Sequence, residues 1–375
     1  MSRSVAEIDV AAIAHNVTLL RQRVGPQRQL CAVVKADGYG HGALTVATAA
    51  LGAGATWLAV AQPAEGATLR AGGIPAPVLL LSEPLDDTEV AQVVANDLRV
   101  TVYSAEVIDA LGATGAPLRL HVKVDTGMGR VGAAPADVLG LIRRIQGHPT
   151  LRLEGLWTHL AQADEPDQPF TGEQLTRFAA VRQELAGVGI EVPVVHAANS
   201  AASLSRPDSW FNLVRAGIAL YGVVPSEQVS RAEPVSAGLR AALRWRSTVS
   251  LVKQLPAGVG VSYGQRHRLV RDTTVATVPV GYADGLWRRW GAAGGVVLIG
   301  GARCPILPPV TMDQVLVDAG PAGTVSRGDE VVLLGTQGAA GIDATEIARA
   351  CDTIAYEVLT AIGPRVTRQP LSARV

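Results

Sequence analysis

The stretch AVVKADGYGHG, residues 32–42, joins a buried strand to a helix. The apolar run Leu30–Val34 predicts the strand, and the glycines at 38, 40 and 42 interrupt it. The alanine-rich run Ala43–Leu51 predicts the helix that follows. Lys35 therefore comes where a parallel strand ends, which is where α/β barrels and open α/β sheets build their sites.

The scarcity of lysine makes Lys35 more informative. The chain has 33 basic residues, yet only Lys35, Lys123 and Lys253 are lysines. An arginine keeps its proton at any ordinary pH, whereas a lysine with a lowered pKa can act as a base or form a Schiff base. We therefore interpret Lys35 as a functional residue; the alternative is that all three are surface lysines.

Strand-like and helix-like segments alternate from Leu30 to about residue 222, which predicts a (β/α)8 barrel of the TIM type. An open doubly wound sheet is the alternative. One of the intervening helices is expected from Thr171 to Gly187, with capping-box spacing between Thr171 and Gln174. The eight expected strands are Leu30–Val34, Trp57–Val60, Val78–Leu81, Arg99–Val102, Leu118–Val122, Leu153–Trp157, Val192–Val195 and Leu213–Val214.

The pattern changes after the barrel. The polar stretch Ser226–Leu239 is expected to be a linker, and the short β-branched runs beyond it predict a mainly β C-terminal domain. One helix, about Asp343 to Ala350, is expected there, and Glu7–Val10 at the start of the chain is expected to be an edge strand. We place the domains at residues 1–238 and 239–375.

Composition excludes several classes of function. The 33 basic and 33 acidic residues balance, so the chain has no nucleic-acid footprint. Its three cysteines are too scattered for a disulfide framework or a zinc site, and no metal is expected. No signal peptide and no apolar stretch of about 20 residues is evident, so we expect a soluble cytoplasmic protein without membrane partners.

Polar residues cluster at the ends of five expected strands. Because the carboxyl ends of barrel strands converge on one mouth, we expect these side chains to meet there. They are Lys35, Tyr39 and His41; Lys123, Asp125 and Arg130; His159; His196, Asn199 and Ser200; and Arg215, Gly217 and Ile218.

The segment Gly127–Gly132 offers a different interpretation, because it matches G-x-G-x-x-G and Glu154 follows about 20 residues later. That spacing is found in dinucleotide-binding turns. We favour a loop, since Asp125 and Thr126 separate the strand from the first glycine and Pro135 predicts a later helix start.

The last two strand-end loops indicate an anion site. Asn199 and Ser200 begin an expected helix, while Gly217 and Ile218 form a glycine turn. Hydroxyl and backbone N–H groups in such places bind phosphate, and barrels often build phosphate sites from these two loops. A phosphate site and a Schiff-base lysine in one mouth indicate pyridoxal phosphate.

Ten stretches in order make the chain resemble the bacterial alanine racemases over almost its whole length. They are AEID (6–9), VVKADGYGHG (33–42), HVKVDTGMGRVG (121–132), THLAQADE (158–165), HAANSAA (196–202), VRAGIALYG (214–222), VSYG (261–264), PVGYADG (279–285), MDQ (312–314) and YEVL (356–359). The resemblance implies a fold-type-III pyridoxal 5'-phosphate enzyme that interconverts L- and D-alanine and supplies D-alanine for peptidoglycan. It also implies a homodimer in which each site borrows residues from the other subunit's β domain.

Residue roles follow from the same resemblance. It implies that Lys35 binds the cofactor covalently and is one catalytic base, and that Tyr263 of the partner chain is the opposite base. Arg215 is expected to face the pyridine nitrogen. The remaining expected residues are Tyr39, Asn199, Ser200, Gly217, Ile218 and Tyr356 on the cofactor, Arg130 and His159 around its ring, Arg130, Met312 and Asp313 on the substrate, and Lys123 as a carbamylated lysine.

Two segments depart from the family pattern. Leu286–Trp290 stands where the family usually has an aromatic-Pro-Arg sequence, and Leu307–Thr311 stands where a Gly-Arg pair is common. Both are expected near the substrate entrance, so a serine or broad-specificity racemase is an alternative. A non-catalytic pyridoxal-phosphate carrier is a second alternative, although such a protein would not need the β domain or Tyr263.

Overall fold

The computed structural model describes residues 3–371 and divides the chain into two compact units. The barrel unit comprises residues 12–38 and 43–240. The β-rich unit comprises, within the described range, the chain up to Ala11, the short segment Tyr39–Gly42 and the chain from Ala241 onward.

The barrel unit contains eight parallel strands in one sheet, in the order β8-β7-β6-β5-β4-β3-β2-β9. All eight predicted strands are present, and most of their residues are buried, as is typical of a parallel sheet that is covered on both faces. Their bounds are β2 (Gln29–Val33), β3 (Trp57–Val60), β4 (Val78–Leu80), β5 (Arg99–Val102), β6 (Leu118–Lys123), β7 (Leu151–Trp157), β8 (Val194–His196) and β9 (Leu213–Ala216).

Hydrogen bonds across the gap between β8 and β9 nearly close the sheet. The Asn212 side chain accepts from Val195 N at 2.7 Å, and Asn212 N donates to Val195 O at 3.3 Å. Arg215 N donates to Ala198 O at 3.0 Å. The (β/α)8 prediction is therefore confirmed, and the open doubly wound sheet is excluded.

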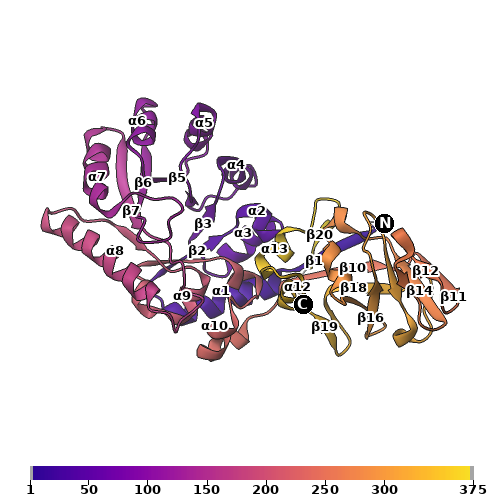
Figure 1. Ribbon diagram of the computed structural model, residues 1–375. Helices are drawn as coiled ribbons and strands as arrows, with labels where there is room; N and C mark the ends of the chain where they lie inside the picture. The colour runs from indigo at the N-terminus through magenta and orange to yellow at the C-terminus, as the bar shows by residue number, and fades with distance from the viewer. Residues whose placement is uncertain (1–2, 372–375) are drawn as a thin grey trace. The chain divides into compact units, whose positions relative to one another are not determined.

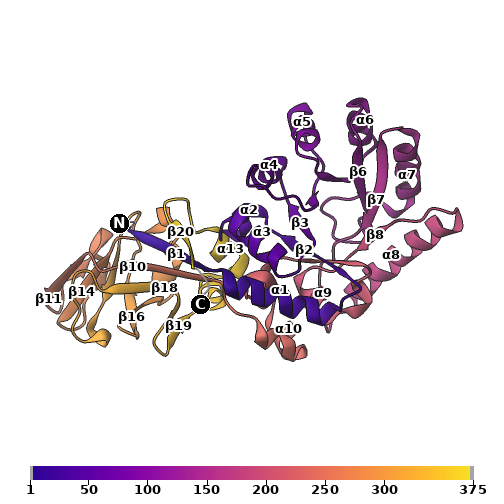
Figure 2. The ribbon, with the colours of Figure 1, turned by 180° about the vertical axis from the view of Figure 1, so that it is seen from behind.

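Helices cover the outside of this sheet, as Figures 1 and 2 show for α4 to α8 around β3 to β7. Their inward faces are apolar; in α7, for example, Leu141, Ile142 and Ile145 are buried. The bounds are α1 (Val10–Val24), α2 (Lys35–Tyr39), α3 (Ala43–Gly52), α4 (Pro63–Ala71), α5 (Asp87–Ala95), α6 (Ala105–Ala113), α7 (Val138–Gly147), α8 (Phe170–Gly187), α9 (Ser200–Ser205) and α10 (Glu227–Ala232), with 3-10 turns η1 (Pro135–Asp137), η2 (Pro207–Ser209), η3 (Ile218–Tyr221) and η4 (Pro234–Gly238).

The β-rich unit is built on a large, mainly antiparallel sheet, and the first strand of the chain is an inner strand of it. Strand β1 (Ser4–Asp9) pairs antiparallel with β10 and parallel with β20. The prediction of an edge strand at Glu7–Val10 was therefore wrong, because β1 has a neighbour on both sides. The other strands are β10 (Leu243–Thr248), β11 (Leu251–Leu255), β12 (Gly260–Val261), β13 (His267–Arg268), β14 (Thr273–Val278), β15 (Val296–Ile299), β16 (Ala302–Leu307), β17 (Val315–Asp318), β18 (Glu330–Gln337), β19 (Ala340–Ile342) and β20 (Thr367–Leu371).

Helical segments are more numerous than predicted outside the barrel repeats. The expected linker Ser226–Leu239 forms α10 and η4, and the Ser226 side chain caps α10 by accepting from Val229 N. The expected helix near Asp343 is α12 (Ala344–Cys351). The β-rich unit also has α11 (Arg288–Ala292), α13 (Ala355–Thr360), η5 (Tyr263–Gln265), η6 (Tyr282–Asp284) and η7 (Gly320–Ala322).

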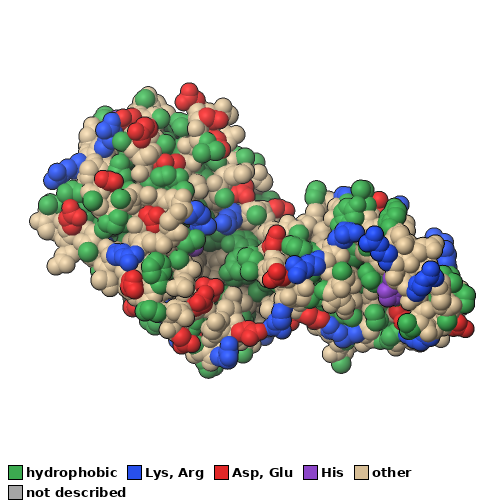
Figure 3. Space-filling view, viewed as in Figure 1, with side chains coloured by type: hydrophobic (Ala, Val, Ile, Leu, Met, Phe, Trp, Pro, Cys, Tyr) green, Lys and Arg blue, Asp and Glu red, His purple; other side chains and the backbone are tan. Residues whose placement is uncertain are grey.

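The charge of the barrel unit is dispersed on the face that Figure 3 shows, where acidic and basic side chains are interspersed. This distribution agrees with the equal numbers of basic and acidic residues in the chain. Within residues 3–371, no helix has both the length and the apolar character that crossing a membrane requires.

Candidate active site

The loop that follows Lys35 is a left-handed turn. Residues 36–39 have φ angles of 52°, 51°, 61° and 52°, and Gly38 N closes the turn by donating to Val34 O at 2.8 Å. For a residue with a side chain this conformation costs about 1–2 kcal/mol. The glycine-based interpretation of this stretch was thus incomplete, because Ala36, Asp37 and Tyr39 adopt the same conformation.

Two carboxylates stabilise this turn. Glu65 Oε1 accepts from Ala36 N at 2.6 Å, and Asp37 Oδ1 accepts from Ala43 N at 2.8 Å, at the start of α3. Strained backbone that the surrounding structure holds in place is typical of functional sites. The turn fixes the end of β2, and with it the backbone of Lys35.

The environment of Lys35 favours the neutral amine. Burial lowers the pKa of Lys35 most, the positive charge of Arg130 lowers it further, and Glu65 opposes the change. A neutral amine is the nucleophilic and basic form of lysine. The lowered pKa of Lys35 therefore agrees with its predicted roles as a Schiff-base lysine and as a base.

Lys123, at the end of β6, is only 2% exposed. Burial lowers its pKa to about 7, and the charges of Arg130 and Arg215 act in the same direction. Its Nζ lies 4.6 Å from the centroid of the Trp157 ring. A buried ammonium among like charges is costly, so the neutral amine of Lys123 is well populated at neutral pH.

Arg215 is only 3% exposed, and hydrogen bonds from its two terminal nitrogens hold the guanidinium in place. Its Nη1 donates to His196 Nδ1 at 2.8 Å, and its Nη2 donates to the carbonyls of Thr158 and Ala197, both at 3.0 Å. Burial lowers the pKa of Arg215 to about 10, so it stays charged at neutral pH. Among the described residues, its Nε–H and one Nη1 hydrogen have no partner.

His159 lies beside this guanidinium. Its Nδ1 is 3.3 Å from Arg215 Nη2, which can only donate, so the hydrogen of the neutral ring is on Nε2. Burial, followed by the charges of Arg215 and Lys123, holds the pKa of His159 well below its usual range. A neutral His159 can therefore offer an Nε2–H donor.

The loops after β8 and β9 meet at Ser200. Ser200 Oγ accepts from Gly217 N at 2.8 Å and from Ala219 N at 3.3 Å, so its own hydrogen remains to be donated. Asn199 caps α9, because its Oδ1 accepts from Ala202 N at 3.1 Å. The structure thus brings Ser200 together with the turn that contains Gly217 and Ile218, while the Asn199 side chain supports the start of the helix.

The segment Gly127–Gly132 is a loop that Asp125 organises. The Asp125 carboxylate accepts from Gly127 N at 2.9 Å and from Gly129 N at 3.1 Å. The next α-helix, α7, begins only at Val138. The dinucleotide-binding interpretation was wrong, because that site needs a helix that starts within the glycine motif.

Gln174 contributes to the site in a way that the sequence interpretation missed. Its Oε1 accepts from Ala161 N at 2.8 Å, and its Nε2 donates to Thr126 Oγ1 at 3.2 Å and to His159 O at 3.0 Å. The predicted capping box with Thr171 is absent, since α8 begins at Phe170 and Gln174 is buried. Its burial among backbone groups was not visible in the helical pattern.

Two of the predicted tyrosines meet in the β-rich unit. The rings of Tyr39 and Tyr356 are 6.1 Å apart at an interplanar angle of 47°. Burial raises the pKa of Tyr39 to about 12, so its hydroxyl keeps its hydrogen. Tyr356 lies on α13, although the short apolar run around it would also suit a strand.

Tyr263 lies at the tip of the hairpin that joins β12 to β13, as the flanking glycines predict. Its side chain is 78% exposed. It lines a hollow of about 450 Å³ together with Arg266, His267, Arg288 and the Pro308–Pro309 pair. None of the described residues that line this hollow is acidic, and both segments that depart from the family pattern contribute to it.

Met312 and Asp313 lie on a loop that other residues fix. Asp313 accepts from Arg365 at 2.8 Å, and the same arginine lies 3.2 Å from Asp284. At Gly281 an added Cβ would lie 2.2 Å from the Met312 carbonyl oxygen, so the two loops pack backbone to backbone. Met312 itself is 52% exposed.

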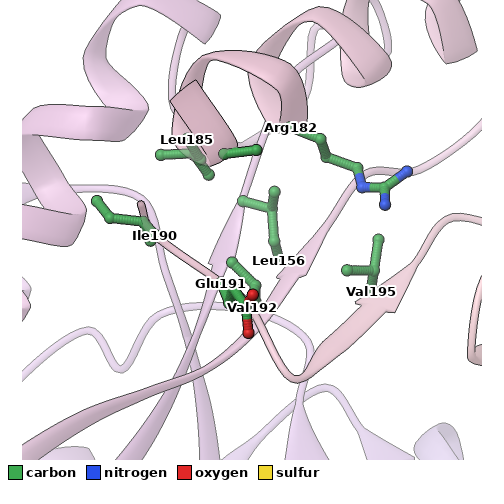
Figure 4. A pocket seen from close by; sticks show the side chains of 8 residues that line it. Leu156, Arg182, Leu185, Ile190, Glu191, Val192 and Val195 are labelled. Carbon is green, nitrogen blue, oxygen red and sulfur yellow. The ribbon is translucent and has the colours of Figure 1, made fainter. Parts of the chain in front are cut away.

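A separate hollow of about 290 Å³ lies between α8 and the strands β7 and β8 (Figure 4). Its wall is mostly apolar, with Arg182 and Glu191 as the charged members. None of the predicted site residues lines it.

The barrel residues fit pyridoxal phosphate. An anionic aldehyde needs an amine with a lowered pKa, cations and hydrogen-bond donors. Lys35 supplies the amine, Ser200 a free O–H, and Arg215 has two N–H groups without partners among the described residues. Because arginine only donates, it suits a pyridine nitrogen that keeps its lone pair.

Comparison with known proteins covers both units. The alanine racemase N-terminal domain matches residues 8–225, and the alanine racemase C-terminal domain matches residues 242–370. An alanine racemase of Symbiobacterium thermophilum is 46% identical over 367 residues, which is 97% of this chain and 96% of that protein.

Solved structures agree with the sequence comparison. The alanine racemase of Streptomyces lavendulae, a D-cycloserine producer, has a TM-score of 0.91 at 39% identity, with 100% of this chain and 98% of that chain covered. The alanine racemase of Bacillus anthracis with bound L-Ala-P has a TM-score of 0.93 at 37% identity, and the match covers 100% of this chain and 96% of that chain. The chain belongs to the alanine racemase family.

Proposed function

We propose that this protein racemises alanine with pyridoxal phosphate. The observation that carries the proposal is Lys35, a lysine with a lowered pKa at the end of β2 among cations, in a chain of this family. When bound, the cofactor supplies an aldehyde that amines attack and a conjugated ring that takes up charge from the substrate Cα.

Several residues would hold the cofactor. Lys35 would bind its aldehyde carbon, and Arg215 would donate a hydrogen bond to its pyridine nitrogen. Ser200, with the turn at Gly217 and Ile218, would bind the phosphate, and the family resemblance adds the hydroxyl groups of Tyr39 and Tyr356. Arg130 and His159 orient the ring, and Asn199 holds Ser200 in place.

Racemisation requires two proton transfers on opposite faces of Cα. Lys35 Nζ serves one face, and Tyr263 Oη of a second copy of the chain serves the other. The 78% exposure of Tyr263 on a hairpin tip supports a role at a neighbouring subunit's site. Met312 and Asp313 of that copy, with Arg130, line the substrate side.

The proposed assembly is a homodimer with shared sites, in which residues 1–238 provide most of the cofactor site and the domain at residues 239–375 completes the partner's site. The product, D-alanine, would supply peptidoglycan synthesis in the cytoplasm.

A direct assay tests the substrate. Purified protein with added pyridoxal phosphate is expected to convert L-alanine into a mixture of both enantiomers, measured by chiral chromatography. The same assay on serine and lysine compares rates at equal concentration. If L-alanine stays optically unchanged while pyridoxal phosphate is bound, the proposed activity is wrong.

A serine or broad-specificity racemase is the second candidate, and it rests on the hollow beside Tyr263. Pro308 and Pro309 line it where the family commonly has a Gly-Arg pair, so this wall lacks a long cationic side chain at that point. Equal or faster turnover of serine in the assay above would favour this candidate, whereas a clear preference for alanine would remove it.

Lys123 is proposed to react with carbon dioxide. The Lys123 ammonium first loses a proton; the neutral amine then attacks the carbon of CO₂, an N–C bond forms as one C=O π bond breaks onto oxygen, and the nitrogen releases a second proton to leave an anionic carbamate near Arg130. With a pKa of about 7 the neutral form grows between about pH 6 and pH 8, and the adduct should grow with it.

Carbon NMR tests this adduct. Protein in ¹³C-bicarbonate is expected to show a carbamate signal that Lys123→Ala abolishes and the exposed control Lys253→Ala retains. Removal of CO₂ should lower racemisation by about tenfold, the effect typical of a lost supporting residue. A signal that persists in Lys123→Ala would contradict the assignment.

A further inference from the structure

A line of hydrogen bonds runs from Arg215 through the barrel interior to a carboxylate. Arg215 Nη1 is 2.8 Å from His196 Nδ1, and His196 Nε2 is 3.0 Å from His121 Nδ1. His121 Nε2 is 3.2 Å from Glu154 Oε2. The four residues lie on β9, β8, β6 and β7, and both histidines are 0% exposed.

The two ends of this line allow one arrangement of hydrogens. A guanidinium only donates, so His196 accepts at Nδ1 and carries its hydrogen on Nε2. That hydrogen is donated to His121 Nδ1, so His121 also carries its hydrogen on Nε2. An ionised carboxylate only accepts, and Glu154 receives that last hydrogen.

The charge states of the histidines agree with this arrangement. Burial, followed by the charge of Arg215, holds the pKa of His196 well below its usual range. Burial also lowers the pKa of His121, although Glu154 opposes it. Each ring is therefore neutral, as a line with one hydrogen per histidine requires.

Strand β7 is adapted to bring its carboxylate to the line. Leu120 pairs with Leu153, but His121 pairs with Gly155, so Glu154 is an extra residue in β7. Bulges of this kind re-aim side chains near functional sites. At Gly155 an added Cβ would lie 2.0 Å from His121 Nδ1, so glycine leaves room for the imidazole ring.

The outer side of the carboxylate is also held. Arg99 Nε lies 3.6 Å and Arg119 Nε 3.8 Å from the Glu154 oxygens. The ring of His196 is also fixed, because it stacks on Trp157 with the ring centroids 5.4 Å apart and an interplanar angle of 8°. Hydrogen bonds of Arg215 and the arginines beside Glu154 thus hold the two ends of the line, and ring packing holds His196 between them.

We propose that Glu154 and His121 are positioning residues, which hold the Arg215 guanidinium toward the cofactor through His196. The inference rests on the proposed function only in that Arg215 faces the pyridine ring. If His196 took the other tautomer, its Nδ1–H would oppose the Nη1–H of Arg215, and a buried donor would lose its partner.

Nitrogen NMR of the histidine rings tests the arrangement in protein without cofactor. In the wild type, His121 and His196 are expected to be protonated on Nε2 and unprotonated on Nδ1 through neutral pH. Because this measurement needs no activity, it separates failure of the line from failure of the proposed function. A wild-type spectrum with His196 protonated on Nδ1 would overturn the proposal without any variant.

Variants connect the line to Arg215. Glu154→Ala is expected to remove the single tautomer of His121, shift the absorption spectrum of bound pyridoxal phosphate, and lower kcat by about tenfold with little change in KM. Glu154→Gln keeps an acceptor and should restore most of these properties.

Asp109→Ala is the matched control. Asp109, on α6, pairs with Arg144 of α7 and lies 3.3 Å from His148, which follows α7, so it is also a carboxylate between arginine and histidine but lies outside the sheet. Asp109→Ala is expected to leave the tautomers of His121 and His196 and the absorption spectrum of bound pyridoxal phosphate unchanged. If Glu154→Ala leaves them unchanged as well, Glu154 has no positioning role.

Discussion

Replacement of Lys35 by alanine is expected to reduce alanine racemisation by about 10⁴-fold, the upper end of what one positioned acid–base group contributes. The variant loses both the amine that binds the cofactor aldehyde and the base on one face of Cα. Production of D-alanine from L-alanine measures the rate. Lys253→Ala is the matched control, since Lys253 is an exposed residue of β11 and should retain wild-type activity.

Chemical trapping makes the assignment of Lys35 direct. Borohydride reduction of the protein with pyridoxal phosphate should attach the cofactor permanently to one lysine, which mass spectrometry of the peptides identifies. The chain has only three lysines, so the result has three outcomes. Attachment at Lys35 agrees with the proposal, whereas attachment at Lys123 or Lys253 contradicts it.

Tyr263→Phe is expected to lower racemisation by about 10²–10³-fold, because one of the two faces of Cα loses its proton donor and acceptor. Lys35 remains, so one enantiomer should still exchange its Cα hydrogen with D₂O while keeping its configuration. Exchange by NMR and racemisation by chiral chromatography, measured on each enantiomer, separate the two functions. Tyr282→Phe, which changes a 44% exposed tyrosine of the same unit, is the control.

Mixing the two inactive variants tests whether the bases come from different subunits. A mixed dimer of Lys35→Ala and Tyr263→Phe would have one site with both replacements and one site with neither. Random exchange at equal amounts should therefore restore about a quarter of the wild-type activity. If each site used both residues of one chain, mixing would restore nothing.

The barrel was predictable because its signals are local. Trp57–Val60 and Arg99–Val102 match β3 and β5 residue for residue, since β3 is a short apolar run and β5 is rich in β-branched residues. The turn at Tyr263 was predictable for a similar reason, because glycines at 258, 260 and 264 mark turns.

The errors arose where a local pattern was ambiguous. Tyr356 is in a short run that suits a strand or a helix, and it lies on the six-residue helix α13. Ser226–Leu239 contains the Pro, Gly and Ser of a linker, but Ser226 caps a helix. Thr171 and Gln174 have capping-box spacing, but Gln174 is buried against the strand-end loops.

The sequence by itself determined the barrel, the place of Lys35 at a strand end and the turn that carries Tyr263, since periodicity and glycine spacing act over a few residues. Only the tertiary structure decided that Ser4 pairs with Ser247 and that Glu154 bulges from β7 toward His121. The same holds for the hydrogen bonds that orient Arg215. These features depend on residues far apart in the chain, whose register no local pattern specifies.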